Sequence, residues 1–156
     1  MRVLVIGATG ALGVPTLRAL AAAGHDAYGL TRTREKAPMV AATGARAVFG
    51  DVMDEVSIER VVAEVRPDAV VQLLNALPKR GPLRPSEMDA TNELRRVGTR
   101  HVLGAAARHG VKRMIVESMI FGYGYGDRGG EALDEDAPFG EPLPGSNSIR
   151  RWARSA

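Results

Sequence analysis

Three closely spaced glycines near the N-terminus constrain the fold of this chain more than any other feature. They lie in the segment GATGALG, residues 7–13, directly after the apolar run Arg2–Ile6 and at the start of a helical pattern, Ala11–Ala23. Glycines between a strand and a helix permit a tight turn, a close approach of the backbone to a pyrophosphate, and tight packing of the helix on the strand. The free N–H groups at the N-terminus of that helix then attract an anion.

This segment therefore predicts a dinucleotide-binding site; the alternative is a turn with a structural role only. The G-x-x-G-x-x-G spacing differs from the commoner G-x-G-x-x-G fingerprint, and no Gly-Lys-Ser/Thr follows, which excludes a P-loop. The predicted cofactor-binding residues of the segment are Gly7, Thr9, Gly10, Ala11, Leu12 and Gly13.

Strand and helix patterns alternate along most of the chain. Short apolar runs predict strands, and Gly24, Gly44 and Gly110 mark the ends of helical segments. This alternation indicates an α/β fold: a Rossmann-like, doubly wound parallel sheet of about five strands in the order 3-2-1-4-5, with helices on both faces. The predicted strands are Arg2–Ile6, Ala27–Thr31, Ala45–Phe49, Ala69–Leu74 and Lys112–Val116, and the predicted helices are Ala11–Ala23, Arg34–Thr43, Asp54–Glu64 and Ser86–Arg108.

The residues after the second strand predict which dinucleotide binds. A site for NAD commonly has an acid here, which accepts a hydrogen bond from the ribose 2′-hydroxyl. This chain instead has the segment TRTREK, residues 31–36, in which Arg32 and Arg34 could pair with a 2′-phosphate. We therefore predict NADP as the preferred cofactor, with NAD as the alternative. A second reading is that Arg34 and Lys36 are simply the solvated start of the following helix.

Residues 2 to about 145 resemble the extended and atypical short-chain dehydrogenases/reductases, the NAD-dependent epimerase/dehydratase group. The resemblance implies that Asp51 and Val52 contact the adenine and that Asn75 and Ala76 line the ribose and phosphates of the cofactor. It also implies a small sugar-like or carbonyl substrate. Asp51 could equally be a cap or turn residue, and the two roles are compatible. The matching segments are GATGALG, Gly50-Asp51-Val52, Gly98-Thr99 with Ala105-Ala106-Ala107, Gly110-Val111-Lys112-Arg113, and Ser118 after the fifth strand.

The catalytic pattern of that family is not found. Its usual catalyst is a Tyr followed four residues later by a Lys, which lowers the pKa of the phenol. The three lysines, Lys36, Lys79 and Lys112, are preceded at that spacing by Arg32, Asn75 and Arg108. If Tyr123-Gly124 matches the family's Tyr-Gly, Met119 occupies the position of the catalytic Ser or Thr.

Ser118 and Tyr123 remain as the catalytic candidates, with Tyr125 as a further hydroxyl and Glu117 as a candidate general base. The alternative function is a non-catalytic dinucleotide-binding module or an inactive truncated product. Family members continue past this length, so we expect residues 1–145 to form the cofactor-binding domain, followed by a short basic tail, residues 146–156. The family's substrate-binding part would then be absent, leaving a sheet edge for a partner chain or a second copy.

Composition narrows the range of partners. Arg150, Arg151 and Arg154 account for the whole net charge of +3, so the rest of the chain is neutral. Three arginines beside Trp152 offer few phosphate contacts, and nucleic acid is not expected as a partner. No apolar run reaches the roughly 18 residues of a membrane helix, and we expect a cytoplasmic protein. The chain has no cysteine, and His25, His101 and His109 lack metal-ligand spacing. We therefore predict surface histidines and no metal site.

Overall fold

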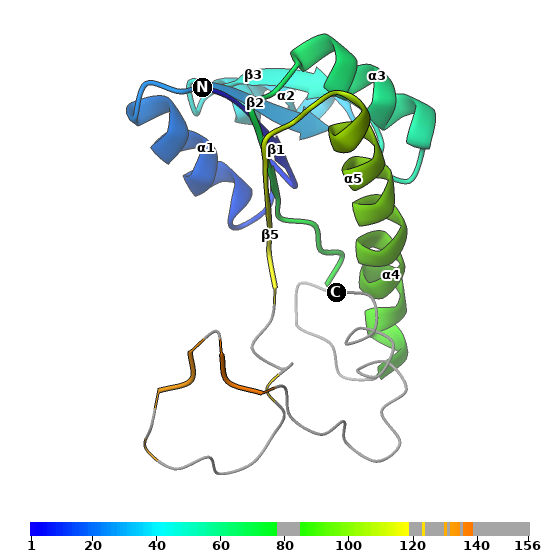
Figure 1. Cartoon of the computed structure of the whole chain (residues 1–156). Helices are drawn as coiled ribbons and strands as arrows, with labels where there is room; N and C mark the ends of the chain where they lie inside the picture. The colour runs from blue at the N-terminus through cyan, green and yellow to red at the C-terminus, as the bar shows by residue number, and fades with distance from the viewer. Residues whose placement is uncertain (78–84, 119–122, 124–129, 131, 135, 139–156) are drawn as a thin grey trace.

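Parallel strands form one sheet in the order β3-β2-β1-β4-β5 within the part of the chain that the structure describes (Figure 1). The structure is a computed structural model, and it describes residues 1–77, 85–118, 123, 130, 132–134 and 136–138. Met119, Tyr125 and the basic tail 146–156 lie outside the described residues. The strand order confirms the predicted fold class and topology. The strands are β1 (Arg2–Ile6), β2 (Asp26–Thr31), β3 (Arg46–Phe49), β4 (Ala69–Gln72) and β5 (Arg113–Val116).

The helices that connect these strands differ from the predicted ones mainly at their ends. The first begins at Gly13 rather than Ala11, because the preceding residues form the turn after β1. The predicted long helix is helical throughout, but a π-helical turn interrupts it. The helical elements are α1 (Gly13–Ala22), η1 (Arg34–Lys36), α2 (Ala37–Ala41), α3 (Glu55–Val65), η2 (Pro85–Met88), α4 (Asp89–Glu93), the π-helical η3 (Leu94–Gly98) and α5 (Thr99–Arg108).

The apolar core has two layers, one on each face of the sheet. Alternate residues of β1 point to opposite faces, so Val3 and Val5 pack with Leu17 of α1, whereas Leu4 and Ile6 pack on the other side. The first layer lies under α1 and α2, and the second under α3 and α5. Burial on both faces explains why the central strand β1 is a nearly continuous apolar run.

Local capping fixes where α3 begins and ends. The Asp54 carboxylate accepts hydrogen bonds from the backbone N–H groups of Val56, at 3.0 Å, and Ser57, at 3.3 Å. This N-cap satisfies donors that the helix itself cannot pair. The helix ends at Arg66, which adopts a left-handed conformation with φ of 47°.

Strand β5 lies at one end of the described sheet, next to β4 (Figure 1). Its apolar side chains are poorly covered by the described residues, with Ile115 60% and Val116 46% exposed. The described helices include none that is long and apolar enough to cross a membrane.

Candidate functional site

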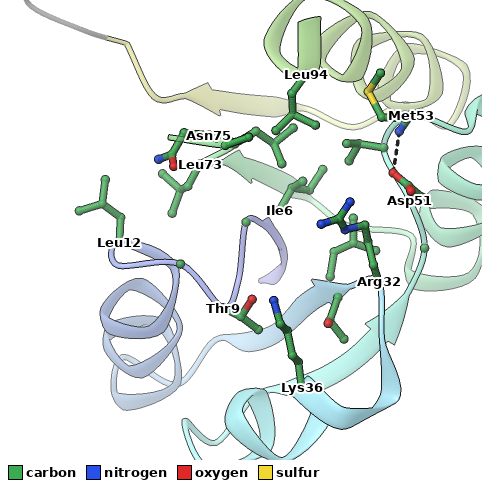
Figure 2. A pocket seen from close by; sticks show the side chains of 18 of the residues that line it. Ile6, Thr9, Leu12, Arg32, Lys36, Asp51, Met53, Leu73, Asn75 and Leu94 are labelled. Carbon is green, nitrogen blue, oxygen red and sulfur yellow. Dashed lines mark hydrogen bonds between the residues drawn. The ribbon is translucent and has the colours of Figure 1, made fainter. Parts of the chain in front are cut away.

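A cavity of about 1070 Å³ runs along the carboxyl ends of β1, β2, β3 and β4 (Figure 2). It lies where the chain crosses from β3 at one end of the sheet to β4 on the other side of β1. Ligands of open α/β sheets bind at this kind of topological switch point. The cavity is lined by the glycine loop, the residues that follow β2, β3 and β4, and residues of α4 and η3.

The glycine loop can take its shape only without side chains at two positions. Gly7 has a φ of +84°, and a Cβ atom there would overlap the carbonyl oxygen of Leu73. A Cβ atom on Gly13 would overlap the carbonyl oxygen of Gly7 and lie 2.7 Å from the Cα atom of Ala8. The loop is closed by a hydrogen bond of 3.0 Å from the N–H of Gly10 to the carbonyl of Gly7.

The N-terminus of α1 points its positive end toward this loop. Its first turn has no acidic residue, and the N-cap residue, Leu12, provides no side-chain hydrogen bond. The helix dipole is therefore not neutralised by the chain itself and favours an anion. Of the predicted residues here, Gly7, Thr9, Gly10, Ala11 and Leu12 line the cavity, whereas Gly13 is buried behind it at the start of α1.

The end of β2 brings two cations to the cavity. Arg32 and Lys36 both line it, and Figure 2 shows their side chains extending into it from the β2 side. Arg34 does not line the cavity, because its guanidinium carbon lies 5.2 Å from the centroid of the Phe49 ring. Arg34 therefore does not accompany Arg32 in the cavity lining, and Lys36 lies there instead. Lys36 reaches the lining because the 3₁₀ turn η1, Arg34–Lys36, follows Arg32 after a bend, and no sequence motif marks this turn.

The acid of this segment, Glu35, lies outside the cavity lining. Hydrogen bonds from its own backbone and from the side chain of Thr33 hold the pKa of the Glu35 carboxyl below its ordinary value. Near Arg32, the lining therefore carries the positive charges of Arg32 and Lys36 without Glu35, the acid that lies between them in the sequence.

The loop after β3, the strand next to β2, forms a further part of the cavity wall. Asp51 accepts a hydrogen bond of 2.9 Å from the N–H of Met53, so its side chain shapes the turn as well as lining the cavity (Figure 2). Val52 is buried, and its carbonyl oxygen lies 2.8 Å from Nδ1 of His101. The prediction of a solvated His101 is wrong, because α5 packs against this loop.

The segment after β4 completes the lining, with Asn75 and Ala76 among its residues. Two side chains of the long helical stretch hold it. The N–H of Ala76 donates to Oγ1 of the buried Thr91 at 2.8 Å, and Nε of Arg95 donates to the carbonyl of Leu74 at 3.2 Å. The cofactor residues predicted after β3 and β4 thus lie together with most of the glycine loop.

The predicted catalytic residues do not line this cavity. Ser118 is exposed and lies two residues beyond the end of β5. The Tyr123 hydroxyl donates a hydrogen bond of 3.2 Å to the carbonyl of Asp134. Glu117 is held by Arg95, whose Nη2 atom lies 3.5 Å from Oε1 of the carboxylate. Among the described residues, no group of three His, Asp or Glu side chains could hold a metal ion.

Sequence reasoning missed several lining residues because they are ordinary in type. Met53, Leu73, Leu74, Glu93 and Leu94 line the cavity, and no motif marks them. The positions of Met53, Leu73 and Leu74 do follow a rule, since the residues after parallel strands meet at one edge of the sheet, whereas Glu93 and Leu94 reach the cavity from α4 and η3.

Comparison with known proteins gives consistent findings. A sequence model of the NAD dependent epimerase/dehydratase family matches residues 3–145. A 3-diazoavenalumate denitrifying reductase from a Streptomyces species is 38% identical over 138 residues, which are 88% of this chain and 43% of that protein.

Two crystal structures of UDP-glucose 4-epimerases share the fold. The enzyme from Bifidobacterium longum, in complex with NAD+ and UDP, has a TM-score of 0.78 at 22% identity, over 99% of this chain and 47% of that one. The enzyme from Thermus thermophilus, in complex with NAD, has a TM-score of 0.76 at 26% identity, over 99% of this chain and 48% of that one. The present chain thus spans less than half the length of these three proteins.

Proposed function

The chain belongs to the NAD-dependent epimerase/dehydratase family, and from this premise we propose that it binds a nicotinamide dinucleotide, preferably NADP, in the cavity along the carboxyl edge of its sheet. One observation carries the proposal. A single cavity joins the glycine loop at the N-terminus of α1, the cations Arg32 and Lys36, and the loop at Asp51. These groups match the pyrophosphate, the adenosine ribose and the adenine of a dinucleotide in kind and in order.

The residues present fit such a cofactor. The backbone of Gly10, Ala11 and Leu12 would hold the pyrophosphate, because α1 has no acid in its first turn. Asp51 and Val52 would contact the adenine. Asn75 and Ala76 would line the ribose and phosphates on the β4 side, and the glycine at position 7 leaves room for the β4 segment to approach the loop.

The preference for NADP rests on charge. Arg32 and Lys36 place two positive groups after β2, where a 2′-phosphate would lie, and Glu35 is outside the lining. A phosphate gains charge-assisted hydrogen bonds from such groups, whereas a 2′-hydroxyl gains much less. Lys36 supports this proposal as directly as Arg32 does.

We further propose that the whole protein is a short-chain oxidoreductase acting on a small sugar-like or carbonyl substrate. A bound nicotinamide would accept or deliver a hydride. Of this chain's residues, Ser118 is exposed beyond the carboxyl end of β5 and is the first candidate that would hydrogen-bond a substrate. Tyr123 is the second candidate, although its hydroxyl already donates to Asp134.

A reductase that removes a diazo group is a second candidate. The 38% identity to the 3-diazoavenalumate denitrifying reductase favours this activity over the activities of proteins that are less similar in sequence. In such a step a hydride would replace dinitrogen on a carbon atom, and N₂ would leave with the former C–N bonding pair. A non-catalytic dinucleotide-binding module remains as the third reading, since the sequence contains no Tyr-x-x-x-Lys.

Calorimetric titration of the purified chain with NADP+ and NAD+ tests the cofactor proposal. We expect saturable binding of both, with NADP+ tighter. Equal affinity for NADP+ and NAD+ would contradict the NADP preference inferred from Arg32 and Lys36. Binding of neither dinucleotide would contradict the cofactor proposal itself. NADPH oxidation measured with carbonyl compounds and with an aryldiazonium salt then separates the two enzymatic candidates from the module.

A further inference from the structure

Arg95 is a charged residue that the proposed cofactor site does not explain. It lies in the π-helical turn η3, and its side chain is only 10% exposed. Its guanidinium makes contacts in two directions. Nε donates to the carbonyl of Leu74, in the wall of the cavity, and Nη2 faces the carboxylate of Glu117 at the end of β5.

Burying this ion pair costs folding free energy, because the two charges lose their contact with water. The Glu117 side chain is 19% exposed, so both charges lie largely away from water. Among the described residues, Nη1 and Nη2 of Arg95, Oε2 of Glu117 and Oε1 of Gln72 are buried without a hydrogen-bond partner. Replacing such a pair by apolar residues of similar volume is often neutral or stabilising in proteins. Stability alone therefore gives no reason for a buried Arg at this position.

The geometry of the cavity wall supplies a reason. Residues 73–77 line the cavity, and the helical stretch holds them through Thr91 at Ala76 and through Arg95 at Leu74. Thr91 and Arg95 are four residues apart, so they lie on the same side of the helical stretch. Arg95 adds a link that Thr91 cannot make, because the same side chain reaches the end of β5 just before Ser118.

We infer that Arg95 is a positioning residue of the dinucleotide site, an inference that rests on the proposed function. It fixes the position of the Leu74 carbonyl, and with it the β4 side of the cavity, relative to the end of β5. The side chain must be Arg, because one rigid fork holds both Nε, which donates to the Leu74 carbonyl, and Nη2, which faces the Glu117 carboxylate. Lys has a single nitrogen, which cannot occupy the positions of Nε and Nη2 at the same time.

The test compares the affinity for NADP+ with the free energy of unfolding in a set of variants. Arg95→Met leaves the Glu117 charge buried and unpaired, so we expect a loss of stability together with a loss of affinity. The double variant Arg95→Met with Glu117→Gln removes both charges. We expect it to regain stability, yet to bind NADP+ about 5- to 20-fold more weakly than the wild type, because the Leu74 carbonyl still lacks its donor.

Two further variants complete the design. Arg95→Lys keeps the charge beside Glu117 without the second donor, so it should remain folded and bind about 3- to 10-fold more weakly. Arg108→Met is the matched control on the same helical stretch, since Arg108 pairs with Glu55 and Glu59 of α3 outside the cavity lining. It should bind NADP+ like the wild type.

The outcomes are distinguishable. If the double variant and Arg95→Lys both bind with wild-type affinity, Arg95 is a structural residue only and the inference is wrong. If the wild type binds neither NADP+ nor NAD+, the proposed function fails and the inference falls with it.

Discussion

Arg34 stacks on Phe49, with its guanidinium carbon 5.2 Å from the centroid of the ring. This contact removes one of three neighbouring cations from the cavity and leaves Arg32 and Lys36 as the pair that lines it. The face of the Phe49 ring already stabilises the positive charge of Arg34. Arg34 is therefore less available than Arg32 or Lys36 to bind a phosphate.

Arg32→Ala and Lys36→Ala should each weaken NADP+ binding about 5- to 50-fold, as expected for loss of a charge-assisted hydrogen bond. NAD+ affinity should change little, because a 2′-hydroxyl carries no charge. Arg34→Ala is the control and should leave the NADP+/NAD+ ratio unchanged. Titration calorimetry at two salt concentrations measures these ratios; a loss of selectivity in Arg34→Ala alone would contradict the assignment.

Gly13→Ala and Gly10→Ala should separate folding from binding. The added methyl on Gly13 meets backbone atoms of Gly7 and Ala8, so we expect a loss of about 1–3 kcal/mol of unfolding free energy or more. Gly10 is exposed, and the nearest contact of its Cβ atom would be the Gly7 carbonyl oxygen at 3.2 Å. Gly10→Ala should therefore unfold nearly like the wild type but bind the dinucleotide less tightly. Urea denaturation and calorimetry give the two readouts.

Asp54→Ala removes the N-cap of α3. The N–H groups of Val56 and Ser57 then lose their acceptor, and we expect about 1 kcal/mol less unfolding free energy. Asp54→Ser should retain most of the stability, because a hydroxyl also caps helices well. Glu64→Ala, an exposed position in the last turn of α3, serves as the control. Equal destabilisation by Asp54→Ser and Asp54→Ala would argue against capping.

The pair Glu59–Arg108 predicts a pH dependence in the acid range. Nε of Arg108 donates to Oε2 of Glu59 at 2.9 Å, and the hydrogen bond from Arg108 is the main cause that lowers the pKa of Glu59 below its ordinary value of 4.5. A carboxyl whose pKa is lower in the folded state stabilises the fold above its unfolded-state pKa, and this contribution is lost as the pH falls through the folded-state pKa.

Wild type should therefore be more stable than Arg108→Ala at neutral pH, by a small margin because the pair is exposed. The difference should shrink as the pH falls below 4.5, the ordinary pKa of Glu59. Unfolding midpoints of both proteins across this pH range measure the effect, and a constant difference would rule out the linkage to Glu59.

Much of the fold was predictable because its signals are local. The strands are short apolar runs, of which the central β1 is buried on both faces, and alternation of strands with helices leaves few parallel topologies to choose from. The glycine loop was predictable for a similar reason. Only residues without a Cβ atom fit between β1, α1 and the Leu73 carbonyl, so Gly7 and Gly13 mark the turn in the sequence itself.

The site was predictable only in part, because the direction of a side chain depends on what packs beside it. Arg34 and Lys36 look alike in the sequence, and the Phe49 ring together with the turn η1 decides which of them reaches the cavity. His101 shows the same limit, since its partner is the backbone of a loop that lies far away in the sequence.

The sequence by itself determined the order of the sheet, the phosphate loop and the edge at which a dinucleotide would lie, because periodicity and glycine placement act between near neighbours. The tertiary structure alone decided where the side chains of Lys36 and Arg95 lie. Whether a long cationic side chain lies in solvent, over a ring or between two strand ends depends on contacts between segments that only folding brings together.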